Sequence, residues 1–419
     1  MLPSNHFTTC CLLVILTVIA ITSSYAADWP QFEGPNRNGV SPETRLARSW
    51  PVGGPCVLWT AKSTLGNGGV AVRDGEVYFL EQDQATGKTT LRCLDFATGA
   101  EKWRYTFADP KMPYGALSTP TVDQRFVFVI GAGGEMHCLD RKTHASRWQA
   151  NLVADFTGKV AEWGVSQSPL LYKNWVIVAP QSPEAGVVAL EKATGKRVWK
   201  SDAIGVMGYS SPFLTTIDNV EQLIMIGKGG RGETEQAHPN LVGIDPANGK
   251  ILWKYNGWRC DHPIPWPTPV GDGRFFLCGW YSATGTMLKV EHTAGQWRVN
   301  ELYTGKPYMT IIQHNLYYDG LLYVTFNGLH CIDLNGNEKW HGKSNFGSGN
   351  FIIADHLIYT MDSDSGMLYL VEATPNGYKE LAKAQVLAGK EIYMPLALAN
   401  GKLLVRDRQQ IKCLDVKNP

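Results

Sequence analysis

The sequence predicts an all-β chain that folds into a single closed, eight-bladed β-propeller, and three observations lead to this prediction. A motif that ends in tryptophan recurs along the chain, with consecutive tryptophans 44, 45, 51, 54, 44 and 43 residues apart. Short runs of β-branched and aromatic residues precede each motif, and four short strands per such period are typical of a propeller blade. Each end of the chain holds a fragment of one further repeat, and one fragment completes the other.

Composition restricts the class of protein. The 419 residues include 39 Lys and Arg against 38 Asp and Glu, a formal net charge of +1. This balance lacks the basic surface expected of a nucleic-acid-binding protein. Since 44% of the residues are hydrophobic and 11% are aromatic, the chain can bury a large core and is not disordered. The 43 glycines, together with only 18% charged residues, favour short strands joined by tight turns.

The chain begins with an apolar segment that we interpret as a signal peptide over residues 1–26. Residues 10–21 form an uncharged run that is shorter than the roughly 20 residues needed to span a bilayer. Residues 24–26 fit the small-x-small pattern before a cleavage site, although no Lys or Arg precedes the apolar run. An uncleaved membrane anchor is the alternative. We therefore expect an exported, periplasmic or secreted protein without a transmembrane segment after cleavage, with a lead-in over 27–56 and the propeller over 57–419.

The repeat unit is a turn followed by a tryptophan strand. Its clearest copy, residues 94–103, contains Asp95, Gly99 and Trp103. An aspartate at such a turn can accept hydrogen bonds from backbone N–H groups two residues further on, and glycine supplies the positive φ of a tight turn. The tryptophan can bury its ring against a neighbouring unit. The corresponding residues of the other copies are Asp140, Trp148, Gly195, Trp199, Asp245, Gly249, Trp253, Asp333, Trp340, Asp415 and Trp59.

The chain ends predict how the ring closes. The last copy reaches Asp415 and stops before its tryptophan strand, whereas the strand around Trp59 has no strands before it. Pairing these two fragments would leave no open sheet edge, which otherwise invites aggregation. Tyr378 takes the place of the tryptophan in a degenerate copy, which brings the number of outer strands to eight. We expect the longest gaps, near residues 181–184 and 229–235, to be loops over one face.

The cysteines do not indicate a disulfide framework. Seven of the nine lie after the first segment, and four of these directly precede the Leu-Asp or Ile-Asp of a repeat: Cys93, Cys138, Cys331 and Cys413. Equivalent positions in different blades are too far apart to pair, so we expect buried, small apolar side chains. A Cys260–Cys278 pair is possible but has no support in the sequence.

The repeat resembles the tryptophan-docking repeat of pyrroloquinoline quinone (PQQ) propellers over about residues 57–416. This resemblance implies the eight-bladed fold of the quinoprotein dehydrogenase type, closed by an N-terminal strand. The chain is also similar to the BamB-like outer-membrane assembly lipoproteins, which use the fold without a quinone. It is similar as well to exported PQQ-like proteins of planctomycete-type bacteria, through residues 28–41, 162–169 and 371–378.

The resemblance also implies what a quinoprotein dehydrogenase would need. Those enzymes hold calcium with Glu and Asn ligands, use an Asp base, and often place a vicinal disulfide against the quinone. This sequence has no vicinal cysteine pair outside residues 10–11, and no Glu–Asn–Asp set can be assigned residue by residue. The lipidated cysteine of the BamB-like proteins is missing too.

Ligand binding in such a fold is expected at the segments that directly precede the inner strands, around the central channel. Aromatic side chains with a few amides, histidines and carboxylates suit a planar or sugar-like ligand, through stacking and hydrogen bonds. The candidate residues are Tyr114, Glu162, Trp163, Tyr209, Asp261, His262, Trp266, Gln313, His314 and Tyr393. The alternative is that these side chains fill the channel and satisfy one another.

Two further segments contain polar groups that could form a metal site or a gate of the channel mouth. In residues 258–262 a Cys, an Asp and a His follow one another, but three donors at this spacing match no standard metal site. We therefore predict no metal there, and expect a surface loop with a capped turn. Arg231 and Glu233 lie in a glycine-rich loop that could gate the channel mouth, although such a loop is more often merely solvated.

These observations favour a monomeric, exported scaffold that binds a protein partner or a glycan, with no cofactor and no identifiable catalytic residues. The alternative is a PQQ- and calcium-dependent alcohol or sugar dehydrogenase, with the quinone in the channel beside Glu162 and Trp163.

Overall fold

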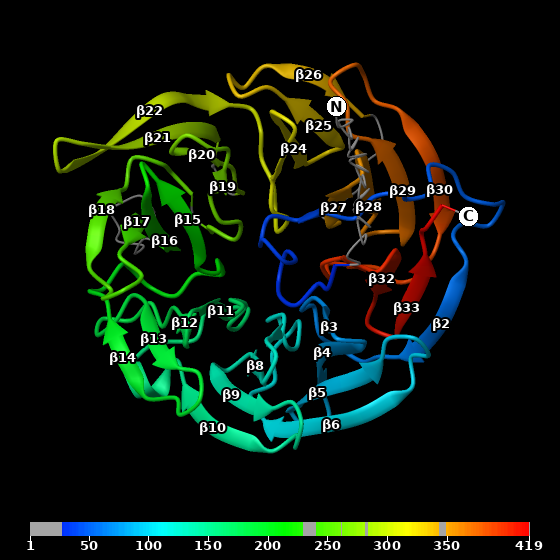
Figure 1. Ribbon diagram of the computed structural model, residues 1–419, viewed down its shortest axis with the longest axis horizontal. Coiled ribbons are helices and arrows are strands. Elements are labelled where there is room, and N and C mark those ends of the chain that lie inside the picture. Colours follow the sequence, from blue (N-terminus) through cyan, green and yellow to red (C-terminus); the bar gives the residue numbers. More distant parts are fainter. Residues whose placement is uncertain (1–26, 229–239, 261, 281–283, 343–348, 419) are drawn as a thin grey trace, which may run out of the picture.

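The computed structural model describes residues 27–228, 240–260, 262–280, 284–342 and 349–418. In this part of the chain the strands form eight antiparallel blades that follow one another around a central axis (Figure 1). The eight-bladed β-propeller predicted from the sequence is therefore confirmed. The predicted signal peptide lies outside the described residues. No helix within the described residues is long and apolar enough to cross a membrane.

Each of the first four blades runs from an inner strand near the axis to an outer strand at the rim. Blade 1 holds β3 (Ala71–Arg73), β4 (Glu76–Asp83), β5 (Lys88–Asp95) and β6 (Glu101–Ala108). Blade 2 holds β7 (Thr121–Val122), β8 (Phe126–Ile130), β9 (Glu135–Asp140) and β10 (Ser146–Asn151), followed by a 3₁₀ turn, η1 (Ala154–Phe156). Blade 3 holds β11 (Leu170–Tyr172), β12 (Trp175–Val178), β13 (Val188–Glu191) and β14 (Arg197–Lys200). Blade 4 holds β15 (Phe213–Ile217), β16 (Val220–Gly227), β17 (Asn240–Ile244) and β18 (Ile251–Tyr255).

The remaining four blades complete the ring in chain order. Blade 5 holds β19 (Thr268–Pro269), β20 (Arg274–Leu277), β21 (Gly285–Thr293) and β22 (Gln296–Lys306). Blade 6 holds β23 (Leu316–Tyr318), β24 (Leu321–Thr325), β25 (Leu329–Ile332) and β26 (Glu338–His341). Blade 7 holds β27 (Phe351–Ala354), β28 (Leu357–Met361), β29 (Met367–Glu372) and β30 (Glu380–Gln385). Blade 8 holds β31 (Ala397–Ala399), β32 (Lys402–Arg406), β33 (Gln410–Asp415) and the N-terminal β2 (Val57–Lys62).

Blade 8 closes the ring as the sequence predicted. Strand β2 pairs antiparallel with β33, with Trp59 opposite Cys413 and Lys62 opposite Gln410. The buried Arg406 of β32 also joins blade 8 to blade 1. Its Nε donates to Ser63 Oγ at 2.8 Å, and its guanidinium lies over the Phe79 ring of blade 1. Segments from both ends of the chain thus complete one sheet and tie it to the next.

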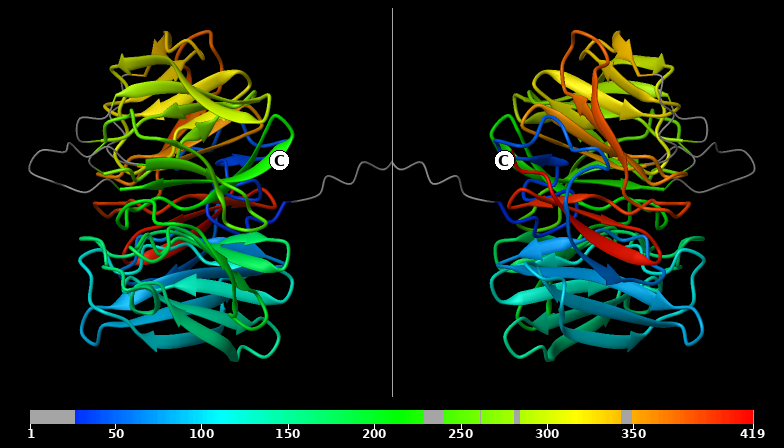
Figure 2. Two further views of the ribbon diagram at one scale, coloured as in Figure 1. Left: turned by 90° about the vertical axis from the view of Figure 1, so that its left-hand side faces the viewer. Right: turned by 90° about the vertical axis from the view of Figure 1, so that its right-hand side faces the viewer.

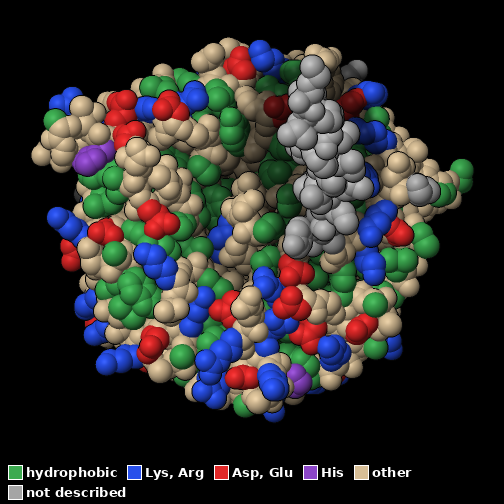
Figure 3. Space-filling view, viewed as in Figure 1, with side chains coloured by type: hydrophobic (Ala, Val, Ile, Leu, Met, Phe, Trp, Pro, Cys, Tyr) green, Lys and Arg blue, Asp and Glu red, His purple; other side chains and the backbone are tan. Residues whose placement is uncertain are grey.

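The lead-in enters the centre of the ring, which the sequence did not predict. Trp29 is only 2% exposed and pairs with Val72 of the innermost strand of blade 1. Farther on, β1 (Val40–Ser41) adds a fifth, parallel strand to blade 7 beside β27. The lead-in and the C-terminus lie on the same side of the ring (Figure 2), where the Ala47 N–H donates to Val416 O at 2.9 Å. On this face Figure 3 shows a central hollow with hydrophobic side chains in it and charged residues around the rim.

The repeat tryptophans join neighbouring blades. Trp148 of blade 2 donates from Nε1 to Lys192 O of blade 3 at 2.8 Å, and its ring lies on Gly195. A Cβ at Gly195 would approach that ring to 2.6 Å, and φ there is +72°, so this position requires glycine on both counts. The same contact joins Trp59 to Gly99 and Trp199 to Gly249. The predicted docking of the ring on the next unit is confirmed for these blades.

The aspartates of the repeat hold their turns by the expected bonds. Asp95 Oδ1 accepts from Ala97 N at 3.1 Å and from Thr98 N at 2.9 Å. These bonds, with one from the Thr98 hydroxyl, keep the pKa of Asp95 below its usual range. Equivalent backbone bonds are made by Asp140, Asp245, Asp333 and Asp415.

No disulfide joins any two of the described cysteines. The four cysteines that precede the repeat aspartates are fully buried, as predicted. Cys260 and Cys278 are also buried, and no disulfide joins them, so the pair left open by the sequence is not formed.

Candidate functional site

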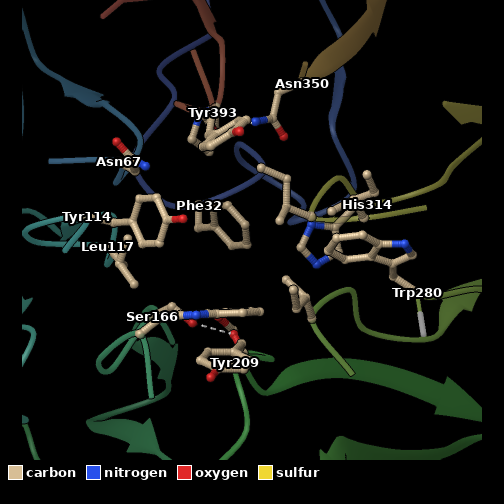
Figure 4. A pocket seen from close by; sticks show the side chains of 16 residues that line it. Phe32, Asn67, Tyr114, Leu117, Ser166, Tyr209, Trp280, His314, Asn350 and Tyr393 are labelled. Carbon is tan, nitrogen blue, oxygen red and sulfur yellow. Dashed lines mark hydrogen bonds between the residues drawn. The ribbon is translucent and has the colours of Figure 1, made fainter. Parts of the chain in front are cut away.

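A cavity of about 360 Å³ lies at the centre of the ring, where the loops that precede the inner strands converge. Every blade contributes at least one residue from such a loop, the lead-in contributes Phe32, and the β20–β21 connection contributes Trp280. The labelled side chains surround an open space in Figure 4. The lining consists of Phe32, Asn67, Tyr114, Leu117, Trp163, Ser166, Tyr209, Ser211, Ile264, Trp280, Ile311, Ile312, His314, Asn350, Tyr393 and Pro395.

The cavity brings together half of the residues proposed from the sequence. Those that line it are Tyr114, Trp163, Tyr209, His314 and Tyr393. His262 and Trp266 lie behind the lining, each packed on a ring that belongs to it. Glu162 is exposed and outside the lining. Gln313 is buried, and its side chain accepts hydrogen bonds from Ile312 N and the Thr310 hydroxyl within its own turn. Asp261 lies outside the described residues.

Trp163 forms a rigid, flat wall of the cavity. Its ring stacks on Tyr209, with centroids 4.9 Å apart, and on His262, with centroids 5.3 Å apart. Ser166 Oγ, also in the lining, donates to Tyr209 O at 2.8 Å and fixes the loop that carries the second ring (Figure 4). A tryptophan backed by two further rings is held in one orientation, which suits stacking against a flat ligand.

The lead-in contributes one ring to the cavity, Phe32, and is anchored by a buried arginine. Phe32 packs edge-on against His314 at 5.2 Å, and His314 lies 4.0 Å from the Trp266 ring. Arg37 is buried, its guanidinium lies 5.4 Å from the Trp266 ring, and its Nη1 donates to Pro169 O at 2.9 Å. Burial lowers the pKa of Arg37 to about 9, although the nearby Glu33 carboxylate acts in the opposite direction. Arg37 therefore anchors the segment that presents Phe32.

Asn67 and His314 of the lining each hold a buried polar atom, Asn67 Oδ1 and His314 Nε2, that has no hydrogen-bond partner among the described residues. Only 8% of Asn67 and 6% of His314 is exposed. A buried polar atom without a partner costs free energy, so such atoms are commonly satisfied by water or by a ligand. Burial also raises the pKa of Tyr393, which keeps its hydroxyl protonated as a donor in the same wall.

The part of the lining that the structure describes contains no Asp, Glu, Lys or Arg. Calcium prefers carboxylate ligands, and here only amides and hydroxyls are available beside one histidine. Glu162, the carboxylate proposed beside the quinone, faces solvent instead. The described residues therefore do not fit a calcium–quinone pair, and we derive no chemical step through one.

Sequence reasoning missed about two thirds of the lining. Asn67, Asn350 and Pro395 lie directly before inner strands, the position at which ligand binding was expected, but no candidate was chosen from the loops before β3 and β27. Applying the same rule to every blade could have found them. Phe32 was missed because no periodic pattern shows that a lead-in turns into the channel. Trp280 was missed because it follows β20 rather than preceding an inner strand.

The segment 258–262 differs from its prediction as a surface loop. Trp258, Cys260 and His262 are at most 5% exposed, and only Arg259 among the described residues of the segment faces solvent. The apolar Trp258 packs into the core cluster of blades 4 and 5, and this draws the segment inward. The loop at 229–235, including Arg231 and Glu233, lies outside the described residues.

Two comparisons with known sequences match part of the chain. The family model described as outer membrane protein assembly factor BamB matches residues 87–259. The quinoprotein ethanol dehydrogenase of Pseudomonas aeruginosa is 28% identical over 154 residues, which is 36% of this chain. That match covers 24% of the dehydrogenase, so the chain spans about a quarter of the length of this curated relative.

Solved structures of similar fold cover nearly the whole chain. The quinohemoprotein alcohol dehydrogenase of Comamonas testosteroni superposes with a TM-score of 0.66 and 12% identity, over 94% of this chain and 81% of that one. BamB of Moraxella catarrhalis superposes with a TM-score of 0.60 and 14% identity, over 87% and 98%. A europium-containing methanol dehydrogenase superposes with a TM-score of 0.64 and 14% identity, over 92% of this chain and 89% of that one. At these identities the likeness concerns the fold alone.

Proposed function

Because the chain is a PQQ-like β-propeller, we propose that it is an exported, monomeric binding protein, a non-catalytic scaffold whose central cavity takes an uncharged glycan. One observation carries this proposal: an aromatic cavity whose described lining has amides, hydroxyls and a histidine but no charged side chain. Sugars are recognised by this combination, since their C–H faces stack on aromatic rings and their hydroxyls bond to amides.

Each wall of the cavity has a part in this proposal. Trp163 supplies the stacking face, and Tyr209 and His262 hold it in place from behind. Asn67 Oδ1 and His314 Nε2 supply polar atoms that a sugar hydroxyl would satisfy. A volume of about 360 Å³ is at the small end of ligand sites, so the cavity suits one or two sugar rings rather than a long chain.

Glycan-array screening followed by calorimetry tests the proposal. We expect a neutral mono- or disaccharide to bind, and Trp163→Ala to weaken binding at least tenfold while Trp163→Phe weakens it less. Trp297→Ala is the matched control, because that ring packs on His292 in the β21–β22 hairpin of blade 5 and does not line the cavity. If no neutral saccharide binds, or if only acidic ones do, the glycan proposal is wrong.

The alternative is a PQQ- and calcium-dependent alcohol or sugar dehydrogenase, favoured by the match to the ethanol dehydrogenase and by the fold. Titrating PQQ with calcium into the purified protein, while following thermal stability and dye-coupled alcohol oxidation, separates the two. Saturable stabilisation with turnover would replace the binding proposal by the enzyme. We expect neither, because the described lining contributes no carboxylate.

A further inference from the structure

We propose that His330, Glu338 and His341, on two adjacent strands of blade 6, form a binding site for a divalent transition-metal ion such as zinc. The three side chains each offer one ligand atom, and these atoms all lie within 4.8 Å of one another. The cluster is separate from the central cavity, of which none of the three is a lining residue.

Strand pairing brings the three residues together. His330 of β25 is directly opposite His341 of β26, and Glu338 lies opposite Ile332 on the same strand pair. A bulge between these pairs shifts the register, which lets all three side chains lie on one side of the sheet. The imidazole rings of His330 and His341 stack 4.1 Å apart at 11°.

Hydrogen bonds to the backbone fix which ring nitrogens can bind a metal. His330 Nε2 lies 3.0 Å from Phe326 O, and His341 Nε2 lies 3.1 Å from Asn327 O. A carbonyl oxygen only accepts, so each Nε2 carries a proton and Nδ1 is the nitrogen of each ring that is left to bind a metal. Metal-ligating histidines are commonly oriented in this way by a carbonyl on the other nitrogen.

The contact between His330 and Glu338 needs a positive species. His330 Nδ1 lies 2.7 Å from Glu338 Oε2. Two lone pairs at this distance repel each other unless a proton or a cation lies between them. Two histidines and one carboxylate are a common ligand set for zinc with an open position, and for other divalent transition metals.

The backbone around the cluster is shaped to admit the rings. Gly328 has φ of +129°, and a Cβ there would lie 2.6 Å from His341 Nε2. A tetrahedral zinc ion needs its ligand atoms about 3.3 Å apart. Binding must therefore lengthen the 2.7 Å contact between His330 and Glu338, bring the ligand atoms that are farthest apart closer together, and turn the stacked rings. Glu338 and His341 are exposed, which leaves them free to make this adjustment.

The site lies on the same face as the loops that line the cavity. In an antiparallel blade, the connection from the second to the third strand and the exit from the fourth strand are at the same end, and His330 and His341 are at these two places. Beyond the exit of β26, the chain returns to the cavity lining at Asn350. A metal here would join the two outer strands of blade 6 on the face where the loops that line the cavity lie.

Calorimetric titration of zinc into the chelator-treated full chain tests the proposal, with cobalt as a spectroscopic probe. We expect one zinc per chain, and a cobalt complex with absorption bands typical of nitrogen and oxygen ligands. His330→Ala, His341→Ala and Glu338→Gln should each lower the affinity about tenfold or more. His356→Asn is the matched control, because this exposed histidine lies in blade 7 outside the cluster, and it should bind zinc like the unmodified chain.

Two results would overturn the proposal: no saturable zinc binding by the unmodified chain, or unchanged binding in the variants. Unfolding midpoints in the presence of a chelator separate a lost ligand from a lost fold. Because His341 is exposed, His341→Ala should keep its midpoint without metal and lose only the rise in midpoint that zinc gives the unmodified chain.

Discussion

At the scale of single residues, the docking tryptophans show what the sequence can and cannot predict. Their spacing predicted the contact with the next unit, because a large ring after a tight turn has only the neighbouring blade to bury against. Two departures from this contact, at Trp103 and Trp253, were not predictable. His144 takes the place of the repeat glycine with φ of +60°, and its ring stacks on Trp103 at 4.5 Å. Trp253 turns onto its own blade and donates to Gln222 Oε1 at 2.7 Å. Both depend on side chains that are far away in the sequence.

His137 is the residue from which we expect the clearest pH dependence. It is 4% exposed on β9, packs 4.1 Å from the Phe107 ring, and its Nδ1 lies 3.2 Å from the Tyr105 hydroxyl. Burial lowers its pKa from 6.5 to about 4, so the unfolded chain takes up a proton in this range before the folded chain does. The free energy of unfolding should therefore fall by up to about 3 kcal/mol as the pH drops from 6.5 to 4.

Urea unfolding at several pH values checks this expectation. His137→Phe keeps an aromatic side chain in the apolar site and removes the proton acceptor, so its stability should change much less between pH 6.5 and 4. His356→Asn, which alters an exposed histidine, should keep the slope of the unmodified chain. A slope that persists in His137→Phe would assign the effect to other groups.

At the scale of elements, the closing strand and the lead-in have different roles. Strand β2 covers the edge of β33, whereas residues 27–50 of the lead-in pair with blade 1 at Trp29, contribute Phe32 to the cavity and pair with blade 7 through β1. The role of β2 was predictable from the incomplete repeats at the two chain ends. That of the lead-in was not, because Trp29, Glu33 and Arg37 find their partners only after the ring has brought distant blades together.

Two truncated chains separate these roles. A chain that begins at residue 63 lacks β2, so β33 presents an open edge and should self-associate. A chain that begins at residue 51 lacks residues 27–50 of the lead-in but keeps β2, so it should remain monomeric with a lower unfolding midpoint. Light scattering after size exclusion measures both. If light scattering gives the two truncated chains the same number of copies per particle, β2 is not what protects the edge of β33.

At the scale of the whole molecule, each described blade packs against the blades on both sides of it, so we expect no single blade to unfold before the others. Hydrophobic clusters span adjacent blades, and the largest joins blades 7, 8 and 1 with the lead-in. We expect tryptophan fluorescence and far-ultraviolet circular dichroism to follow the same urea transition, as in a cooperative unit. Separate transitions for the two signals would show that groups of blades unfold independently.

The architecture of the molecule was thus predictable from local spacing, whereas the content of its centre was not. A repeat fixes how many blades there are and where each turn falls. Which side chains meet at the axis depends on residues from eight loops at once, and only half of the candidates line the cavity.

The pairing of β2 with β33 also has a consequence for how the protein is made. The two strands are separated by roughly 350 residues of chain. At a synthesis rate of about 5–20 residues per second, β2 leaves the ribosome tens of seconds before its partner exists. During this time blades 1 to 7 have been translated, but the ring is open and β2 has no partner strand. The ring can therefore close only after β33 has been translated.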